Sequence, residues 1–247
     1  MTADSQEQIK ALRAAGSMVR QVFEQMKAAA KPGVTTGELD AIAIRLFEQK
    51  GAQSAPQLFY EFPGATCISV NEEAAPGIPG DRKLRDGDML NIDVSAKYQG
   101  VVADMGESFV VGRGRRAQER ICEAVRKAVT KAIAEIKPGR SLNVIGQTVQ
   151  KVADRMGYQI VENLGSHGVG ESIHEEPSYI PRDNPQESRR LTEGLVLTVE
   201  PFFTTGPAWV DEAADGWTLK VPTGELVAQF EQTVIVSRNG PIVVTAA

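Results

Sequence analysis

The feature that most constrains the fold is an internal repeat, in which the same helix-breaking triplet occurs twice, 106 residues apart. Lys31-Pro32-Gly33 ends a stretch from about Ser5 to Ala30 in which apolar side chains recur at helical spacing. Lys137-Pro138-Gly139 ends a similar stretch from about Arg116 to Ile136. Proline and glycine are poorly tolerated inside helices, so each triplet predicts the end of an amphipathic helix. The repeat therefore predicts two halves built to one plan.

Each triplet is followed by a second predicted helix with its own start and stop signals. In the first copy, Thr35 and Glu38 form a capping box, and Gly51 is expected to end the helix. In the second copy, Ser141 is expected to cap the helix, and Gly157 falls where Gly51 does in the first. Each half is thus expected to begin with a pair of helices.

Short β-rich stretches follow each predicted helix pair. They lie at Leu58–Val70, 88–110, Tyr158–Glu162, Gly194–Phe202, Trp217–Val221 and Leu226–Val236. We therefore expect an α+β fold of two pseudo-symmetric halves, about 5–110 and 111–240, with a curved antiparallel sheet that carries the helices on its outer face. The halves are expected to join around a shared cleft. Because no flexible linker separates them, residues 1–247 are expected to form one domain.

Composition narrows the possible partners. A net charge of −5 gives no overall attraction for nucleic acid or anionic lipid, and no apolar run approaches the ~20 residues that a membrane-spanning helix needs. The N-terminal stretch lacks a hydrophobic signal core, so we expect a cytoplasmic protein. Its two cysteines, Cys67 and Cys122, are then expected to be free thiols.

Two aspartates lie in apolar surroundings within one predicted β-hairpin. Asp93 and Asp104 flank a turn expected at Lys97–Gly100, and a turn centred between Tyr98 and Gln99 would place the two aspartates directly opposite each other. Like charges in opposed positions destabilise an antiparallel pair unless something neutralises them. A divalent cation would do so.

The second half carries acidic residues in equally apolar strands, Glu200 and Glu231. Pairing each buried carboxylate with a lysine or arginine is the plainer interpretation for any one of them. The strands that carry the four acids contain almost no basic residues, however, and an unpaired buried carboxylate costs several kcal/mol. Four carboxylates are too many for a single catalytic zinc ion and suit two divalent ions.

The chain has only two histidines, His167 and His174. His167 lies in Gly-Ser-His-Gly-Val-Gly, which is expected to form a glycine-lined turn, and it is the natural nitrogen ligand; a surface histidine without a role is the alternative. His174 would serve as a hydrogen-bond donor or proton carrier. Carboxylates with one imidazole suit manganese, iron, cobalt or zinc.

These motifs resemble those of the type I methionine aminopeptidases, metallopeptidases of the pita-bread fold. The resemblance rests on NIDV with an aspartate eleven residues later, then GSHGVG, HEEP, VEP and AQFEQT, and it covers nearly the whole chain. It implies that Asp93 chelates one ion, that Asp104 and Glu231 bridge two ions, and that His167 and Glu200 hold the other. The implied cofactors are two divalent ions of cobalt, manganese, iron or zinc.

The resemblance also implies a reaction, the hydrolytic removal of N-terminal methionine from peptides and nascent proteins. Glu200 would accept a proton from the attacking water, and His174 would hydrogen-bond the substrate amide or the tetrahedral intermediate. The enzyme is expected to act as a monomer. The residues that match the family's methionine pocket are Phe59, Phe62, Cys67, Ile173 and Trp217.

One position departs from the family pattern. Pro76 stands where the family carries a substrate-contacting histidine, and proline can neither donate a hydrogen bond nor carry a proton. Loss of one oriented donor costs on the order of 10² to 10³ in rate, so reduced activity is expected. Two alternatives follow, an aminopeptidase with altered substrate preference and a weakly active or non-catalytic peptide-binding protein of the same fold.

Overall fold

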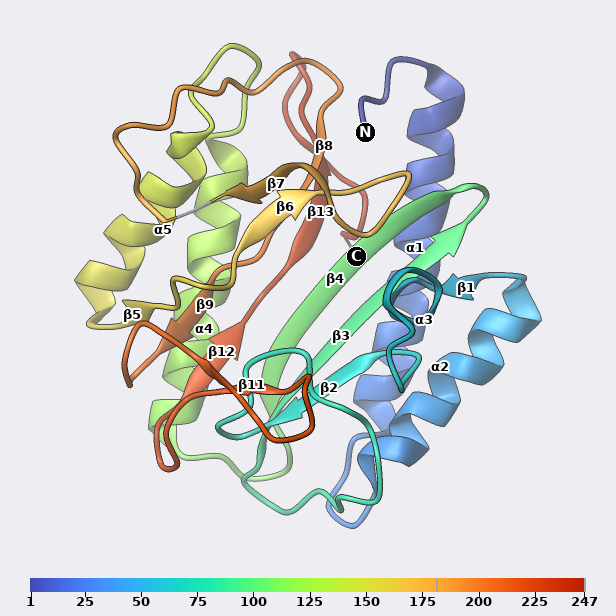
Figure 1. Cartoon of the computed structure of the whole chain (residues 1–247), viewed down its shortest axis with the longest axis vertical. Coiled ribbons are helices and arrows are strands. Elements are labelled where there is room, and N and C mark those ends of the chain that lie inside the picture. Colours follow the sequence, from blue (N-terminus) through green and yellow to red (C-terminus); the bar gives the residue numbers. More distant parts are fainter. Residues whose placement is uncertain (181, 247) are drawn as a thin grey trace.

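Two pairs of long helices flank the strands in the computed structural model, which describes residues 1–180 and 182–246. The first pair is α1 (Gln6–Ala29) and α2 (Thr36–Lys50), and the second is α4 (Arg116–Ala134) and α5 (Asn143–Met156). A short helix, α3 (Ala55–Tyr60), follows the first pair. Figure 1 shows α1 and α2 in blue on one side, and α4 in green and α5 in yellow-green on the other, with strands running between them.

The helix ends follow the predicted signals closely. Thr35 and Glu38 form the capping box of α2, and Gly51 closes that helix in the left-handed conformation, with φ of 69°. Gly157 closes α5 in the same way, with φ of 79°. The predicted cap at Ser141 is wrong by one residue. Leu142 is the N-cap of α5, although the Ser141 hydroxyl still accepts a hydrogen bond from the backbone N–H of Asn143.

The first half forms a four-stranded antiparallel sheet. Its strands are β1 (Gln53–Ser54), β2 (Cys67–Val70), β3 (Met89–Tyr98) and β4 (Val101–Val110), and β3 pairs with the other three. The predicted strand Leu58–Val70 is correct only for its last four residues. The segment up to Tyr60 is helical, because Ser54 caps α3 and Pro56 occupies its first turn.

The second half contains more strands than the sequence predicts. Five of them form one antiparallel sheet, in the order β14 (Ile242–Val243), β13 (Gln232–Ile235), β8 (Val196–Val199), β6 (Ser166–Gly168) and β7 (Glu175–Ile180). Three form another, in the order β12 (Val227–Gln229), β9 (Phe202–Thr204) and β5 (Gln159–Ile160), and β10 (Asp211–Glu212) pairs with β11 (Leu219–Lys220). The sequence did not predict β6 and β7, because their glycines, proline and charged side chains are atypical of strands.

The β3–β4 hairpin is present, but its predicted register is wrong. The turn consists of Gln99 and Gly100, both with positive φ, which is the geometry of a two-residue hairpin turn. Asp93 therefore pairs with Gly106, and Asp104 pairs with Ser95. The two aspartates are diagonal neighbours on one face of the hairpin, not directly opposed, because a shift of two residues preserves the face.

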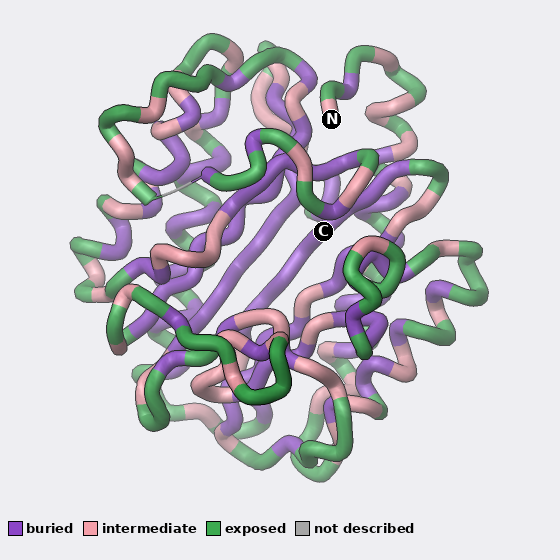
Figure 2. The backbone as a smooth tube through the Cα atoms, viewed as in Figure 1, coloured by how far each residue is buried: buried purple, intermediate pink, exposed green. Residues whose placement is uncertain are grey.

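The two halves meet along β4. The backbone N–H of Glu231 donates to the carbonyl of Gly106 at 2.8 Å, and Glu107 forms a β-bridge with Phe230. One hydrophobic core lies between α1, α2 and the first sheet, and a second lies between α4, α5 and the strands of the second half. Figure 2 shows the central strands buried along almost their whole length. Within residues 1–180 and 182–246, no helix has the length and apolar character to cross a membrane.

Candidate metal centre

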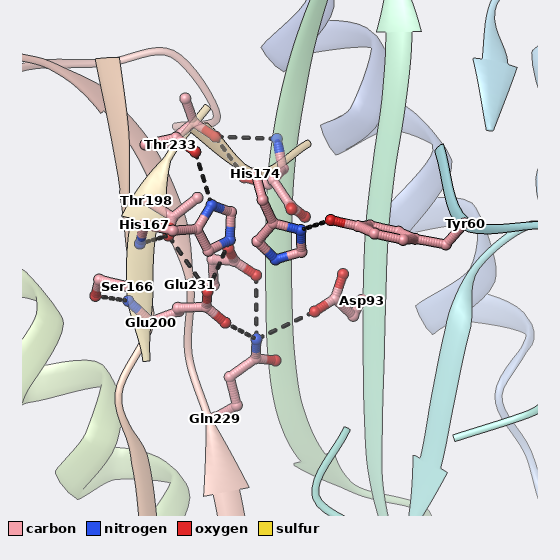
Figure 3. A network of polar contacts seen from close by, with 12 residues as sticks. Tyr60, Asp93, Ser166, His167, His174, Thr198, Glu200, Gln229, Glu231 and Thr233 are labelled. Atoms are coloured by element: carbon pink, nitrogen blue, oxygen red, sulfur yellow. Dashed lines mark hydrogen bonds and ion pairs between the residues drawn. The ribbon is translucent and has the colours of Figure 1, made fainter. Parts of the chain in front are cut away.

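The five predicted ligand side chains converge where the two halves meet. Asp93 lies on β3 and Asp104 on β4, while His167 lies on β6, Glu200 directly after β8, and Glu231 between β12 and β13. Figure 3 shows the side chains of Asp93, His167, Glu200 and Glu231 directed toward a common region. Ligand atoms of Asp104, His167 and Glu231 all lie within 4.8 Å of one another. The His167 Nε2 atom is 3.0 Å from the Glu200 Oε1 atom. The four acids and the histidine therefore form one cluster.

The side chain of Gln229 joins the cluster from its centre. Its Nε2 donates to carboxylate oxygens of Asp93 at 3.1 Å, Glu231 at 3.1 Å and Glu200 at 3.2 Å. The amide is held in turn by Asn91, whose Nδ2 donates to Gln229 Oε1 at 2.8 Å. Gln229 thus connects Asp93, from the first half, with two acids of the second half.

A glycine makes room for this amide. A Cβ atom on Gly106 would lie 2.2 Å from Gln229 Oε1, so any larger residue would displace the amide. Gly106 is also the direct cross-strand partner of Asp93. The sequence predicts the carboxylate of Asp104 directly opposite Asp93. In the structure, the side chain of Gln229 occupies that space, above Gly106.

The cluster brings several carboxylates together in a buried position, where their negative charges repel one another. Burial, followed by the charge of Glu200, raises the pKa of Asp93 to about 6. Burial and the neighbouring carboxylates raise the pKa values of Asp104 and Glu231 well above the usual carboxyl range. Within the described residues, one buried oxygen of each of these two, Asp104 Oδ1 and Glu231 Oε1, has no hydrogen-bond partner. Such oxygens require either protons or a cation.

The side chain of His167 is oriented as a metal ligand would be. Its Nδ1 lies 2.9 Å from the carbonyl oxygen of Gly168, which accepts the Nδ1–H. In the neutral ring, Nε2 then carries a lone pair, and it faces a Glu200 oxygen. Burial alone would lower the pKa of His167, but the hydrogen bond to Glu200 and its charge outweigh burial and raise the pKa, so the metal-free pair also accommodates a proton. In the neutral form, the Nε2 lone pair and the Glu200 oxygen face each other, as two ligands of one metal ion do. The carbonyl of Gly168 fixes this tautomer.

His167 lies in a strand, and the glycine-lined turn predicted around it is wrong. The glycine after it serves strand pairing, because a Cβ atom on Gly168 would lie 2.4 Å from the carbonyl oxygen of Glu176 on β7. The glycine allows β6 and β7 to approach closely at an irregularity in their register.

A cavity of about 250 Å³ opens beside the cluster. Asp93, Asp104, His167 and Glu200 line one part of it. Its apolar wall includes four of the five predicted pocket residues, namely Phe62, Cys67, Ile173 and Trp217. The rings of Phe62 and Trp217 meet edge to face, with centroids 5.2 Å apart. Burial, followed by the charge of Asp93, raises the pKa of the Cys67 thiol well above its usual value, so this side chain is neutral.

Phe59, the fifth predicted pocket residue, does not line the cavity. It packs against the first hydrophobic core, and Lys97 Nζ lies 5.9 Å from the centre of its ring. Because α3 is helical, successive residues point in different directions, and the neighbouring Tyr60 lines the cavity instead. The strand predicted for this segment is wrong, and for that reason Tyr60 is absent from the predicted pocket. Pro76 also lines the cavity.

His174 lies at the mouth of the cavity, next to His167. Its ring centroid is 4.1 Å from that of His167, and its Nδ1 lies 2.6 Å from the hydroxyl oxygen of Tyr60. Desolvation at the cavity mouth, followed by the proximity of His167, lowers the pKa of His174 to about 4. Its ring is therefore neutral at pH 7.

Gln229 and Asn91 are not among the residues that the sequence predicts for this site. Alternation along a strand was the available signal, since each lies two residues before an acid of the cluster and shares its face. The hydrogen bond between them joins residues 138 positions apart, which a single sequence does not reveal.

Comparisons with known proteins show which family the chain belongs to. Residues 10–238 match the profile described as metallopeptidase family M24. A methionine aminopeptidase of Staphylococcus epidermidis is 44% identical over 247 residues, which cover 99% of this chain and 98% of the relative. A methionine aminopeptidase of Escherichia coli is 36% identical over 97% of this chain and 91% of its own.

Solved structures of methionine aminopeptidases resemble this chain over its whole length. The crystal structure of methionine aminopeptidase from Thermotoga maritima superposes with a TM-score of 0.95, at 29% identity and with both chains fully covered. The pita-bread fold that the sequence resemblance implied is thereby confirmed. The chain belongs to metallopeptidase family M24 and, within it, to the methionine aminopeptidases.

Proposed function

We propose that this protein hydrolyses the first peptide bond of peptides and nascent proteins that begin with methionine, and that it uses two divalent metal ions of cobalt, manganese, iron or zinc. The observation that carries the proposal is the convergence of four carboxylates and one imidazole beside an apolar cavity. Two of the buried oxygens have no hydrogen-bond partner in the described part of the chain, which supports a cation at the cluster. All five side chains come from one chain, so a monomer would suffice.

The residues divide between the two proposed positions. Asp93 would hold one ion, His167 and Glu200 the other, and Asp104 and Glu231 would lie between them. When bound, the ions would supply a hydroxide at neutral pH and polarise the peptide carbonyl. Gln229 would keep Asp93, Glu200 and Glu231 together, since its amide donates to all three.

Glu200 and His174 are the groups that we propose handle protons. Glu200 lines the cavity, and its carboxylate would accept the proton of the attacking water and pass it to the departing amine. His174 also lines the cavity and is neutral at pH 7, so one ring nitrogen can donate a hydrogen bond to the substrate amide or to the developing oxyanion. With Pro76 in the cavity wall and His167 in the cluster, the chain offers no third imidazole for this task.

The apolar part of the cavity would take the methionine side chain. Phe62, Trp217 and Ile173 provide aromatic and aliphatic surface, and Cys67 provides a neutral thiol. A thioether packs favourably against aromatic rings and sulfur because it is polarisable. We propose that the enzyme acts in the cytoplasm, where nascent chains carry N-terminal methionine and where Cys67 and Cys122 would remain the free thiols that they are in the structure.

A peptide assay tests the proposed function. The purified protein, supplied in turn with manganese, cobalt, iron and zinc, should release methionine from a Met-Ala-Ser peptide. A matched Leu-Ala-Ser peptide and a Met-Pro-Ser peptide serve as controls for the first and second residues. Glu200→Gln should lower the rate by at least about 10³-fold, since it removes a proton acceptor and a ligand oxygen charge together. Release of leucine at the same rate as methionine, or full activity of Glu200→Gln, would contradict the proposal.

A further inference from the structure

Tyr60 makes a contact that joins the two halves of the chain across the cavity mouth. It is the last residue of α3, and its hydroxyl oxygen lies 2.6 Å from Nδ1 of His174, 114 positions away. The two rings are tilted at 60°, with centroids 5.5 Å apart. Both residues line the cavity. The contact therefore lies at the site itself.

The second ring nitrogen of His174 is available to the cavity. Among residues 1–180 and 182–246, the His174 side chain has a hydrogen bond only with Tyr60, at Nδ1. In Figure 3 the imidazole lies between His167 and Tyr60, and its other nitrogen faces the side of the ring where Asp93, Glu231 and Gln229 lie. A donor at that nitrogen would point toward the place where the scissile bond is proposed to bind.

The chemistry of the pair decides which nitrogen carries the hydrogen. A neutral imidazole has one N–H and one lone pair, and its tautomer is set by the hydrogen bond that the other nitrogen makes. A phenol is a stronger donor than acceptor, and an imidazole lone pair is a stronger acceptor than a phenol oxygen. The hydroxyl of Tyr60 is therefore expected to donate to Nδ1, which leaves the hydrogen on Nε2.

We propose that Tyr60 is a positioning residue that holds His174 as the Nε2–H tautomer and fixes the direction in which that N–H points. The catalytic consequence rests on the proposed function, in which His174 donates to the substrate. Tyr60 itself need not touch the substrate to have this effect.

The backbone around His174 is held by other contacts. The side chain of Glu175 accepts hydrogen bonds from the N–H groups of Glu171 and Ser172, and the Ser172 hydroxyl donates to the carbonyl of His174 at 2.7 Å. Removal of the Tyr60 hydroxyl should therefore leave the loop in place. Only the tautomer and orientation of the ring should change.

Tyr60→Phe tests the proposal, because it keeps the aromatic ring and deletes the hydroxyl. Tyr98→Phe is the matched control, since Tyr98 lies at the end of β3 and its hydroxyl has no hydrogen bond within the described residues. Nitrogen-15 NMR of the zinc-loaded protein reads the tautomer directly, because zinc is diamagnetic and the chain has only two histidines. The spectrum of unmodified protein should show His174 protonated at Nε2 alone. In Tyr60→Phe, the signals should move toward a mixture of tautomers, while Tyr98→Phe should match the unmodified protein.

Kinetics should change in parallel with the spectrum. Loss of a partner that orients a functional histidine typically costs 10- to 100-fold, so Tyr60→Phe should lower kcat for Met-Ala-Ser by about 10-fold or more, with KM little changed. His174 protonated at Nδ1 or at both nitrogens in the unmodified protein, or an unchanged spectrum in Tyr60→Phe, would overturn the proposal. The spectrum decides the proposal by itself. Absence of methionine release by the unmodified protein would contradict the proposed function instead.

Discussion

At the scale of single residues, two buried acids on one strand show how surroundings decide chemistry. Asp104 and Glu107 both lie on β4, and only 4% and 2% of their surfaces are exposed. Their odd spacing places them on opposite faces of the strand. Glu107 faces the helices, where Lys27 and Arg126 neutralise it. Asp104 faces the cluster and has an oxygen without a partner among the described residues. An apolar strand context alone does not distinguish a carboxylate that forms a salt bridge from one that belongs to the candidate metal centre.

Gln229 provides a prediction at the same scale. Its amide donates to three carboxylates of the cluster, so it offsets part of their mutual repulsion when no cation is bound. Gln229→Met keeps the length of the side chain and removes the donor. We expect the free energy of unfolding of the metal-free protein to fall by about 1 to 3 kcal/mol. Saturating manganese should recover most of the loss, because the cation then neutralises the carboxylates. Urea unfolding with and without manganese measures both values.

Gln232→Met is the control for that experiment. Gln232 is a buried glutamine on the next strand, whose amide bonds the Glu231 carbonyl oxygen and the Thr245 hydroxyl and none of the carboxylates. Its loss of stability should be similar with and without manganese. If Gln229→Met also lost equal stability in both conditions, Gln229 would be an ordinary core hydrogen-bonding residue and the role assigned to it here would be wrong.

At the scale of helices and strands, the local signals in the sequence predict the elements better than their pairing. The capping box at Thr35 and the closing glycines Gly51 and Gly157 act within a few residues, and each is found as predicted. The register of the β3–β4 hairpin depends on which residues adopt positive φ in the turn, and there the prediction fails by two positions. Contacts between elements, such as Tyr60 with His174, carry no local signal at all.

The contact of Glu107 with two helices gives a prediction for these elements. Lys27 on α1 and Arg126 on α4 both donate to Glu107 Oε1, at 2.5 Å and 2.7 Å, so one carboxylate on β4 joins the first helix of each half. Glu107→Gln removes the charge and keeps the shape. Because both cations are partly exposed and can be rehydrated, the expected loss in free energy of unfolding is roughly 1 to 3 kcal/mol, less than for a fully buried pair.

The surface pair of Arg20 and Glu24 on α1 is the comparison for Glu107. These residues form an ion pair one helical turn apart in which Glu24 is exposed and Arg20 partly exposed, so Glu24→Gln should cost no more than about 0.5 kcal/mol. The midpoints of urea unfolding of the two variants, measured with excess metal, compare the contribution of the buried Glu107 contacts with that of the surface pair. An equal midpoint for Glu107→Gln and the unmodified protein would show that the link between α1 and α4 contributes nothing to stability.

At the scale of the whole molecule, the candidate metal centre depends on the joining of the two halves. Asp93 and Asp104 come from the first half, and His167, Glu200 and Glu231 come from the second. The sequence repeat predicts both halves, and the isolated acids in apolar strands predict which side chains need compensation. How the strands meet along β4 depends on long-range packing, and the position of Gln229 within the cluster follows from it.

Burial of so many carboxylates couples metal binding to pH. In the metal-free protein, burial and the charge of Glu200 raise the pKa of Asp93 to about 6, and burial and the neighbouring carboxylates raise the pKa values of Asp104 and Glu231 well above the usual carboxyl range. Protons therefore compete with cations for the same oxygens. Metal affinity should be greatest above neutral pH and should fall as the pH decreases toward 6 and below.

Calorimetric titration of the metal-free protein with manganese at pH 7.5 is the most direct test of the metal centre. We expect about two equivalents to bind, with the tighter one in the micromolar range or below, and we expect Asp104→Asn to abolish binding of at least one of them, since Asp104 is proposed to lie between the two ions. Absence of binding at micromolar manganese, or the same stoichiometry and affinity in Asp104→Asn, would contradict the assignment of this cluster as a metal centre.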